Sequence, residues 1–291
     1  MNRFFDFDTT AQLLGFDFVR NALLAAALLG LVAGVLGPLI VVRSMSFSVH
    51  ATSEMSFTGG AAALLLGISV GYGALAAAVV TAVGLSLLGQ RRNDRDSVIG
   101  AVLAFGLGMG VLLLWFYPGR ASNKFGLLIG QPITVAQSGV TLLGGCALVV
   151  LVVVALIYRP LLFASVDPAL ADARGVPVRR LSLLFAVLVG VATALGVQTV
   201  GALLVMSLLV TPAAAASRVS SSPARVTLLS VLFAEVSVLG GIVLSLAPGA
   251  PVSAFVATIS FVIYLVCRAI GALRTKTRRR LFARPVLASA A

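Results

Sequence analysis

The chain has 291 residues, of which 60% are hydrophobic and only 10% are charged. A soluble domain of this length needs many more charged residues to cover its surface, so the composition excludes a soluble globular protein. The formal net charge of +12 would suggest nucleic-acid binding in a soluble protein. In a membrane protein, basic residues instead collect in cytoplasmic loops. We therefore expect an integral membrane protein in contact with lipid, with no nucleic-acid partner.

The N-terminal residues 1–17 do not look like a cleavable signal peptide. They carry acidic residues where a signal peptide is basic, and no clear small-residue cleavage site follows them. We expect these residues to form an extracytoplasmic leader and the first apolar span to remain in the mature protein.

Residues 18–271 contain a series of apolar segments, most of them long enough to cross a hydrocarbon core about 30 Å thick. Their pattern is helical or uniformly apolar and lacks the alternation of a β-barrel. The sequence therefore predicts an all-α, polytopic transmembrane helical bundle of eight or nine spans. A mixed segment at 118–137 has the character of a short interfacial or re-entrant helix. In chain order, the expected spans are 18–42, 45–68, 72–88, 97–117, 140–158, 181–195, 200–216, 226–246 and 252–270.

The distribution of basic residues predicts the orientation of this bundle. Alternate connections, together with the basic tail at 272–291, hold 17 of the 21 Lys and Arg residues. The other side holds only Arg3, Arg20, Arg120 and Lys124. By the positive-inside rule, the C-terminus is expected in the cytoplasm and the N-terminus outside.

Only two of the nine acidic residues, Glu54 and Glu235, lie inside apolar segments. Glu54 follows His50, the only histidine, by four residues, which places both side chains on one face of a helix. An imidazole and a carboxylate at this spacing can both reach one divalent cation. The surrounding half-helix is rich in Ser and Thr and is too polar to face lipid, so it must line protein or water.

Other interpretations of these groups remain open at this point. His50 and Glu54 can form a simple buried polar pair, or a proton relay in a secondary transporter that also uses Glu235. Glu235 stands alone, and a structural hydrogen bond explains it as well as a transport role does. An intramembrane metalloprotease is disfavoured, because the chain has one histidine and no HExxH motif.

A polar connection, SVDPALADARGVPVRR, interrupts the apolar pattern after the fifth expected span. Its Asp-Pro pair is typical of a helix start, and Gly175 is a candidate C-cap. The segment at about 166–175 is therefore expected to be a short helix on the cytoplasmic side. It is either an ordinary interfacial helix or a docking helix for a cytoplasmic partner.

Three stretches resemble the permease subunits of ABC importers for zinc, manganese or iron, and the resemblance extends from about Phe18 to Ile270. Arg43–Gly59 is similar to the end of a span followed by the family's polar helix. FASVDPALADARGVPV resembles the family's cytoplasmic coupling helix, which implies that Asp167, Pro168, Ala171 and Gly175 couple the permease to an ATPase. VQTVGALLVMSLLVTPAAAASRV resembles the family's pattern of Gly, an apolar run, Pro and small residues.

The first stretch departs from the family's pattern. His50 stands where the family usually has Asp, Glu54 where it usually has His, and Thr58 where it usually has Pro. The ligand chemistry is retained in reversed order, so the resemblance implies a metal site at His50 and Glu54. Such a ligand pair suits Zn, Mn or Fe(II), as transported ions rather than permanent cofactors.

The resemblance also implies an assembly in the bacterial cytoplasmic membrane. The chain has no GxxxxGK[ST] motif, so cytoplasmic ATPase subunits would supply ATP hydrolysis. A second permease copy would bring two His50/Glu54 pairs together across a two-fold axis. An extracytoplasmic metal-binding protein would deliver the ion.

Overall fold

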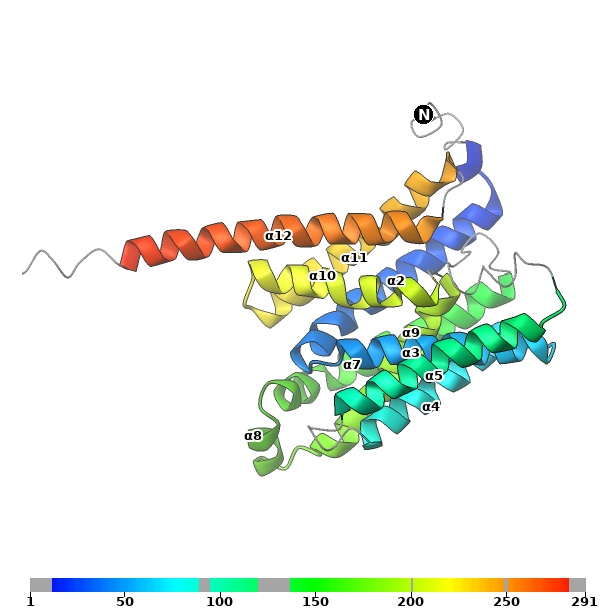
Figure 1. Ribbon diagram of the computed structural model, residues 1–291. Coiled ribbons are helices and arrows are strands. Elements are labelled where there is room, and N and C mark those ends of the chain that lie inside the picture. Colours follow the sequence, from blue (N-terminus) through cyan, green and yellow to red (C-terminus); the bar gives the residue numbers. More distant parts are fainter. Residues whose placement is uncertain (1–11, 89–94, 120–136, 200, 249–250, 283–291) are drawn as a thin grey trace, which may run out of the picture.

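The chain forms a bundle of helices that run back and forth along one direction, as a computed structural model shows (Figure 1). The structure describes residues 12–88, 95–119, 137–199, 201–248 and 251–282. Every regular element within these ranges is a helix. The elements are α2 (Asp17–Val42), α3 (Ser46–Leu65), α4 (Val70–Leu88), α5 (Arg95–Phe116), α7 (Gln137–Val166), α8 (Pro168–Ala173), α9 (Val178–Thr199), η3 (Ala202–Leu204), α10 (Val205–Val219), α11 (Pro223–Leu246) and α12 (Val252–Phe282).

Each of the nine predicted spans overlaps one long helix, and α8 falls in the predicted polar connection. Seven of the helices in the described ranges are long and apolar enough to cross a membrane. The other two are α3, whose first half is rich in Ser and Thr, and α10, which is apolar but has only 15 residues. Such helices need protein around them at membrane depth. The predicted all-α, multi-spanning bundle is confirmed.

Several predictions concern residues outside the described ranges. These are most of the leader, the basic connection at 89–94, residues 120–136 of the mixed segment, and the end of the tail at 283–291. At the edges of these gaps, Asp17 already belongs to α2, and the tail continues α12 as helix up to Phe282. The last turns of α12 extend well beyond the rest of the bundle (Figure 1).

Small residues allow the central helix α2 to pack closely against its neighbours. A Cβ added to Gly30 would lie 2.8 Å from Oε1 of Glu235, and one added to Gly34 would overlap Val231 of α11. This Gly-x-x-x-Gly spacing is the usual means by which transmembrane helices bring their backbones together without a hydrophobic driving force. The contact fixes α11 against α2 and leaves α3 to pack on other helices.

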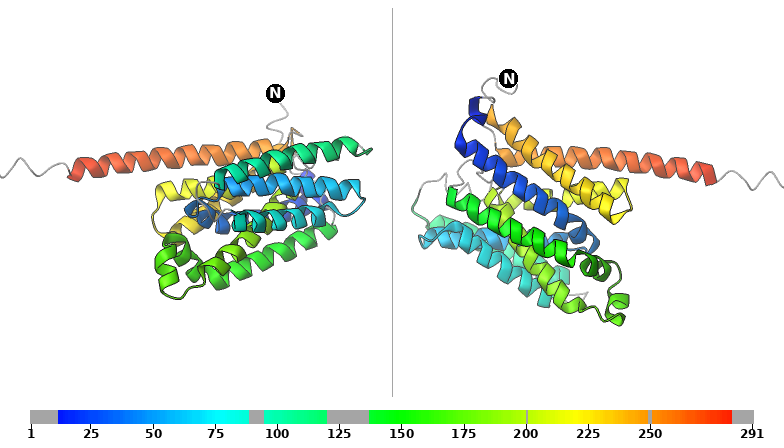
Figure 2. Two further views of the ribbon diagram at one scale, coloured as in Figure 1. Left: turned by 60° about the horizontal axis from the view of Figure 1, so that its bottom comes forward. Right: turned by 180° about the vertical axis from the view of Figure 1, so that it is seen from behind.

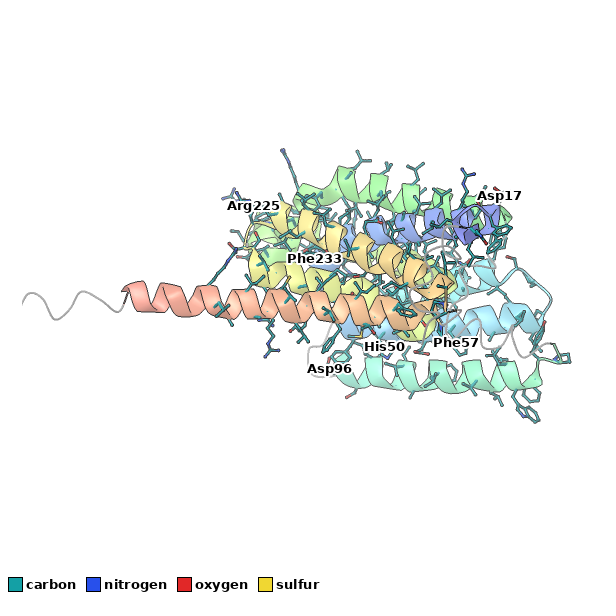
Figure 3. All side chains as sticks on the ribbon, turned by 90° about the horizontal axis from the view of Figure 1, so that it is seen from above. Asp17, His50, Phe57, Asp96, Arg225 and Phe233 are labelled. Atoms are coloured by element: carbon teal, nitrogen blue, oxygen red, sulfur yellow. The ribbon has the colours of Figure 1, made fainter. Side chains whose placement is uncertain are left out.

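One end of the bundle collects the elements that the sequence assigns to the cytoplasmic side. The turn between α2 and α3, the helix α8, the connection between α10 and α11, and the C-terminal end of α12 all lie there (left in Figure 1), and the two views in Figure 2 agree. Arg225 lies at this end and Asp17 at the other (Figure 3). That this end faces the cytoplasm stays a prediction.

Candidate metal-ion site

The hydroxyl side chains of α3 fasten this polar helix to its neighbours. Ser56 Oγ donates to the carbonyl oxygen of Ala74 on α4 at 3.1 Å, and Thr58 Oγ1 donates to that of Gly106 on α5 at 2.5 Å. Ser53 Oγ donates to the carbonyl oxygen of Ala202 in η3 at 3.2 Å. The Ser and Thr residues that make α3 unsuited to lipid therefore line protein, and they hold the helix in place on three sides.

His50 and Glu54 lie one turn apart on α3, as the sequence predicts. His50 Nδ1 is 4.0 Å from Glu54 Oε1, which is too long for a hydrogen bond. The Glu54 side chain is only 2% exposed, whereas that of His50 is 29% exposed. The carboxylate therefore lies inside the bundle, while the imidazole reaches its surface.

Both side chains have polar atoms that no group in the described part of the chain satisfies. His50 Nδ1 and Glu54 Oε2 are buried and have no hydrogen-bond partner there. Leaving such groups unpaired in a low-dielectric interior is costly, so in native structures they are normally satisfied by protein, water or a bound ion. A simple buried polar pair would be expected to close the 4.0 Å gap.

The separation of the two groups fits a shared ion. Two atoms that both bind one metal ion at about 2.1 Å cannot lie more than about 4.2 Å apart. The 4.0 Å between Nδ1 and Oε1 is just inside this limit. The two atoms are therefore close enough to share one cation.

One chain supplies only part of a coordination sphere. Within the described ranges, no group of three or more His, Cys, Asp or Glu side chains lies close enough to hold a metal ion. Transition metals such as zinc and manganese take four to six ligands. A metal ion held by the His50/Glu54 pair would therefore need further ligands from water or from another molecule.

The His50 side chain is 29% exposed, so a ligand from outside the chain could reach part of it. Seen from above, His50 lies between α12 and α5, and Phe57 follows it along the same helix (Figure 3). Phe57 is fully buried and packs on Gly110 of α5. Phe57 therefore fills the contact between α3 and α5, while His50 stays partly exposed.

The structure does not bring Glu235 to this pair. Its carboxylate lies on α11 against Gly30 of α2, and its buried Oε1 has no hydrogen-bond partner among the described residues. A third acid near His50 and Glu54 would have completed a metal-binding group, and none is present in these ranges. The two intramembrane glutamates therefore occupy separate places in the bundle.

The predicted coupling segment forms α8, a six-residue helix with a defined start and end. Asp167 is its N-cap and accepts a hydrogen bond from the Leu170 amide at 2.9 Å, and Pro168 occupies the first turn. Gly175 adopts φ +79°, the left-handed conformation that favours glycine after a helix. Ala171 is fully buried, whereas Leu170 is exposed. The helix is thus capped at its start and terminated by a glycine, and most of its surface is exposed at the end of the bundle.

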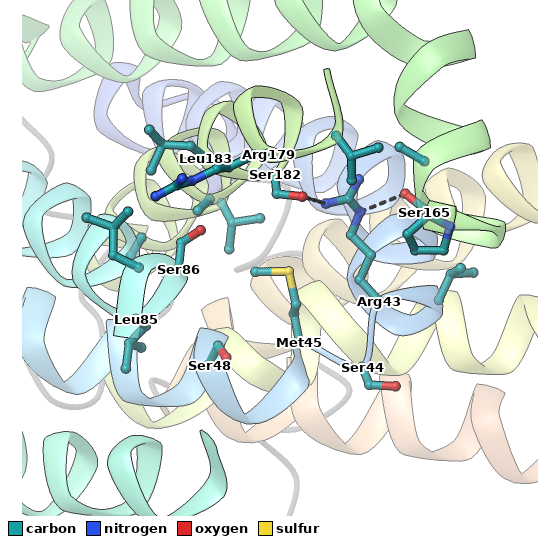
Figure 4. Close-up of a pocket in the computed structure, with 18 of the residues that line it drawn as sticks. Arg43, Ser44, Met45, Ser48, Leu85, Ser86, Ser165, Arg179, Ser182 and Leu183 are labelled. Atoms are coloured by element: carbon teal, nitrogen blue, oxygen red, sulfur yellow. Dashed lines mark hydrogen bonds between the residues drawn. The ribbon is translucent and has the colours of Figure 1, made fainter. Parts of the chain in front are cut away.

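A cavity of about 630 Å³ opens beside α8, but it is not the His50/Glu54 site. Its lining combines the turn after α2 with parts of α3, α4, α7 and α9 (Figure 4). The lining includes Arg43 and Arg179, several hydroxyl groups and no acidic residue. A cavity with this charge does not attract a metal cation. The sequence around Arg43 indicates a basic end of a span, and no local pattern predicts its place in this cavity.

Comparison with protein families supports the resemblance over most of the chain. Residues 15–271 match the sequence model of the ABC 3 transport family. The chain is 32% identical over 235 residues, 80% of either protein, to the manganese transport system membrane protein MntC of Halalkalibacterium halodurans. It is 24% identical over 231 residues to the high-affinity zinc uptake system membrane protein ZnuB of Haemophilus influenzae, covering 79% of this chain and 88% of ZnuB.

A solved structure has the same fold. PsaBC from Streptococcus pneumoniae, determined in complex with a Fab, superimposes with a TM-score of 0.80 at 26% sequence identity. The match covers 89% of this chain and 94% of the other. The predicted permease fold is therefore confirmed over nearly all of the bundle.

Proposed function

The chain belongs to the ABC 3 transport family and is a membrane-spanning permease subunit of a metal-ion ABC importer, and from this premise we propose that His50 and Glu54 pass the metal ion across the bilayer. It is a multi-pass protein of the bacterial plasma membrane. The observation that carries the proposal is the pair of unsatisfied atoms, His50 Nδ1 and Glu54 Oε2, on adjacent turns of a helix enclosed by protein.

The transported ion is a divalent transition metal, manganese, zinc or iron. One imidazole nitrogen and one carboxylate suit all three ions, and relatives are named for manganese and for zinc transport. A site of few ligands also suits transport, because the ion must leave as readily as it enters.

The site is completed by a second copy of the chain. A two-fold axis beside the partly exposed His50 brings two imidazoles and two carboxylates together, which is a four-ligand set for one ion. This arrangement explains why one chain holds only two of the ligands in its described ranges.

ATP hydrolysis takes place on separate subunits that dock on α8. The chain itself has no P-loop motif. The exposed face of α8, including Leu170, supplies the contact, and Asp167, Pro168, Ala171 and Gly175 maintain the shape of the helix. An extracytoplasmic binding protein delivers the ion at the other end of the bundle, and alternating access follows from movement of α8 relative to α3.

The test is metal uptake by the complete complex in liposomes. His50→Ala and Glu54→Ala should each reduce uptake by more than about tenfold, because loss of a ligand weakens binding at least as much as loss of its supporting shell. Assembly with the ATPase and basal ATP hydrolysis should remain. Normal uptake by both variants would remove the pair from the transport path.

Glu235→Gln is the matched control, since it replaces the other intramembrane carboxylate by a group of the same shape. The proposal expects this variant to transport normally. A proton-coupled transporter that uses Glu54 and Glu235 predicts the opposite, namely that Glu235→Gln stops uptake and that uptake proceeds without ATP.

A further inference from the structure

Arg43 holds together the elements that the proposed mechanism must move in concert. It is the first residue after α2, in the short turn that leads into α3. Its Nε donates to Ser165 Oγ of α7 at 2.7 Å, and its NH1 donates to Ser182 Oγ of α9 at 3.1 Å. Its guanidinium lies over the ring of Phe185, 5.0 Å from the centroid. One side chain from the α2–α3 turn thus contacts both α7 and α9 (Figure 4).

The two serines that accept these hydrogen bonds flank α8 in the sequence. Ser165 precedes the N-cap Asp167 by two residues, and Ser182 lies in the first turns of α9. The helices α7 and α9 are therefore the two arms of a hairpin whose tip is α8. Arg43 bonds both arms close to that tip, so a tilt of α8 changes the positions of both of its partners.

The turn that carries Arg43 leads directly to the metal ligands. Ser44 adopts φ +54°, and no other residue except glycine has a positive φ within the described ranges. Met45 N donates to the Ile40 carbonyl oxygen at 3.0 Å, which closes the turn before α3 begins at Ser46. The chain is therefore tightly folded between Arg43 and α3, and His50 follows in the second turn of that helix.

The chemistry of the contact favours a positioning role over simple stabilisation. Among the described residues no carboxylate pairs with Arg43, and its buried NH2 has no hydrogen-bond partner. A charge buried in this way costs desolvation that an apolar residue would avoid. The planar guanidinium group of arginine carries N–H donors at fixed, separated positions, so it bonds acceptors on two helices at the same time. The single ammonium group of lysine is too compact to do this.

Packing alone does not fix the turn. Arg43, Ser44 and Met45 all line the cavity of about 630 Å³, so one side of the turn faces space rather than other side chains. The hydrogen bonds to Ser165 and Ser182 connect the turn directly to the two helices that flank α8.

We propose that Arg43 is a positioning residue that transmits movement of α8 to the metal-binding helix α3 through its hydrogen bonds to Ser165 and Ser182. This inference rests on the function proposed above. It assigns Arg43 no contact with the metal ion, since the residue acts through the turn.

The test is the number of metal ions taken up per ATP hydrolysed by the reconstituted complex. Arg43→Gln should lower this ratio about tenfold, within the usual range of energetic coupling between sites. The rate of ATP hydrolysis and the affinity of the resting complex for metal should stay close to wild type. A residue needed only for stability would lower all three quantities together with the amount of folded complex.

Arg179→Gln is the matched control. Arg179 is exposed on α9, lines the same cavity, and has no hydrogen bond or ion pair within the described ranges. Its replacement removes the same charge without breaking a contact, so the transport ratio should remain that of wild type. An equal loss with Arg179→Gln would show that only charge matters and would overturn the proposal.

The serine variants test the contact without removing a charge. Ser165→Ala and Ser182→Ala should each lower the ratio in part, and the double variant should match Arg43→Gln. Adding Arg43→Gln to the double variant should have no further effect, since the interaction is already absent. A wild-type ratio in the double serine variant overturns the proposal even if Arg43→Gln fails to fold. Normal uptake by His50→Ala, by contrast, would refute the metal site and not this contact.

Discussion

At the scale of single residues, similar polar side chains on α3 serve different purposes. Thr58 Oγ1 donates to the carbonyl oxygens of Glu54 and Gly106, and Ser53 Oγ donates to those of His50 and Ala202. These hydroxyls are fully used by backbone acceptors. By contrast, His50 Nδ1 and Glu54 Oε2 have no hydrogen-bond partner among the described residues. The polar groups of this helix that we propose as metal ligands therefore differ from its hydroxyls in having atoms without such a partner in the described ranges.

Thr58→Val tests this distinction, because valine has the shape of threonine without the hydroxyl. The variant should lower the free energy of unfolding by about 1 kcal/mol, as expected for an interhelical hydrogen bond in a membrane. Its KM for metal uptake should not change. Thr58→Ser retains the hydroxyl and should be closer to wild type in stability. If the KM rises strongly in Thr58→Val while stability is normal, Thr58 is a ligand.

At the scale of helices, the position of α3 depends on a backbone contact with α4. A Cβ added to Gly59 or to Gly73 would overlap the backbone of the facing helix. Ser56 adds its hydrogen bond to Ala74 one turn away. This close approach of the two backbones sets the distance between α3 and α4 at these glycines.

Gly73→Ala should be destabilising because the added methyl group has no space. We expect a loss of about 1–3 kcal/mol in unfolding free energy, the usual cost of an overpacked core. Gly84→Ala is the control on the same helix, since a Cβ there meets nothing within 4 Å. Alanine favours helix over glycine, so this variant should be neutral or slightly stabilising. Thermal unfolding in detergent compares the two, and equal melting temperatures would show that α3 and α4 do not pack this closely.

The helix α8 depends on its N-cap. Asp167→Ala removes the acceptor for the Leu170 amide and should destabilise the helix by about 1 kcal/mol. Co-purification of the ATPase with the permease should then decrease. Asp167→Asn retains an N-cap of similar strength and should keep the partner bound. Loss of binding in both variants would mean that the charge of Asp167, rather than the shape of α8, makes the contact.

At the scale of the whole molecule, the proposed shared site would make the two permease copies interdependent. If each ion binds both copies, one defective copy disables the whole site. Complexes can be purified through two different tags so that each holds one wild-type copy and one His50→Ala copy. We expect their uptake to be close to that of the double variant. Half of wild-type uptake would show instead that each copy transports by itself.

The sequence was a good guide to features that depend on neighbouring residues. Apolar segments of the sequence located the long helices, seven of which are long and apolar enough in the described ranges to cross a membrane. The spacing of His50 and Glu54 placed them on one face of a helix, and Asp167 with Pro168 marked the start of α8. These signals are local because a membrane-spanning helix satisfies its backbone internally.

Contacts between segments that are distant in the chain could not be predicted from the sequence. Arg43 is 122 residues from Ser165 and 139 from Ser182, and no local pattern relates them. The role of the hydroxyls on α3 also required the positions of α4, α5 and η3 to be known. Polarity alone indicated that these side chains avoid lipid, but it did not identify which of them were already bonded.

As the only histidine in the sequence, His50 can serve as a spectroscopic reporter of its own surroundings. Because the chain has one histidine, ¹⁵N-labelled imidazole yields the signals of a single ring, provided that purification avoids a histidine tag. Its Nδ1 faces Glu54 without a hydrogen bond in the described part of the chain, so its chemical shift responds directly to what enters the gap. Paramagnetic Mn²⁺ would broaden those resonances, whereas diamagnetic Zn²⁺ would shift them. The same resonances can then be followed while nucleotide binds to the far side of the complex.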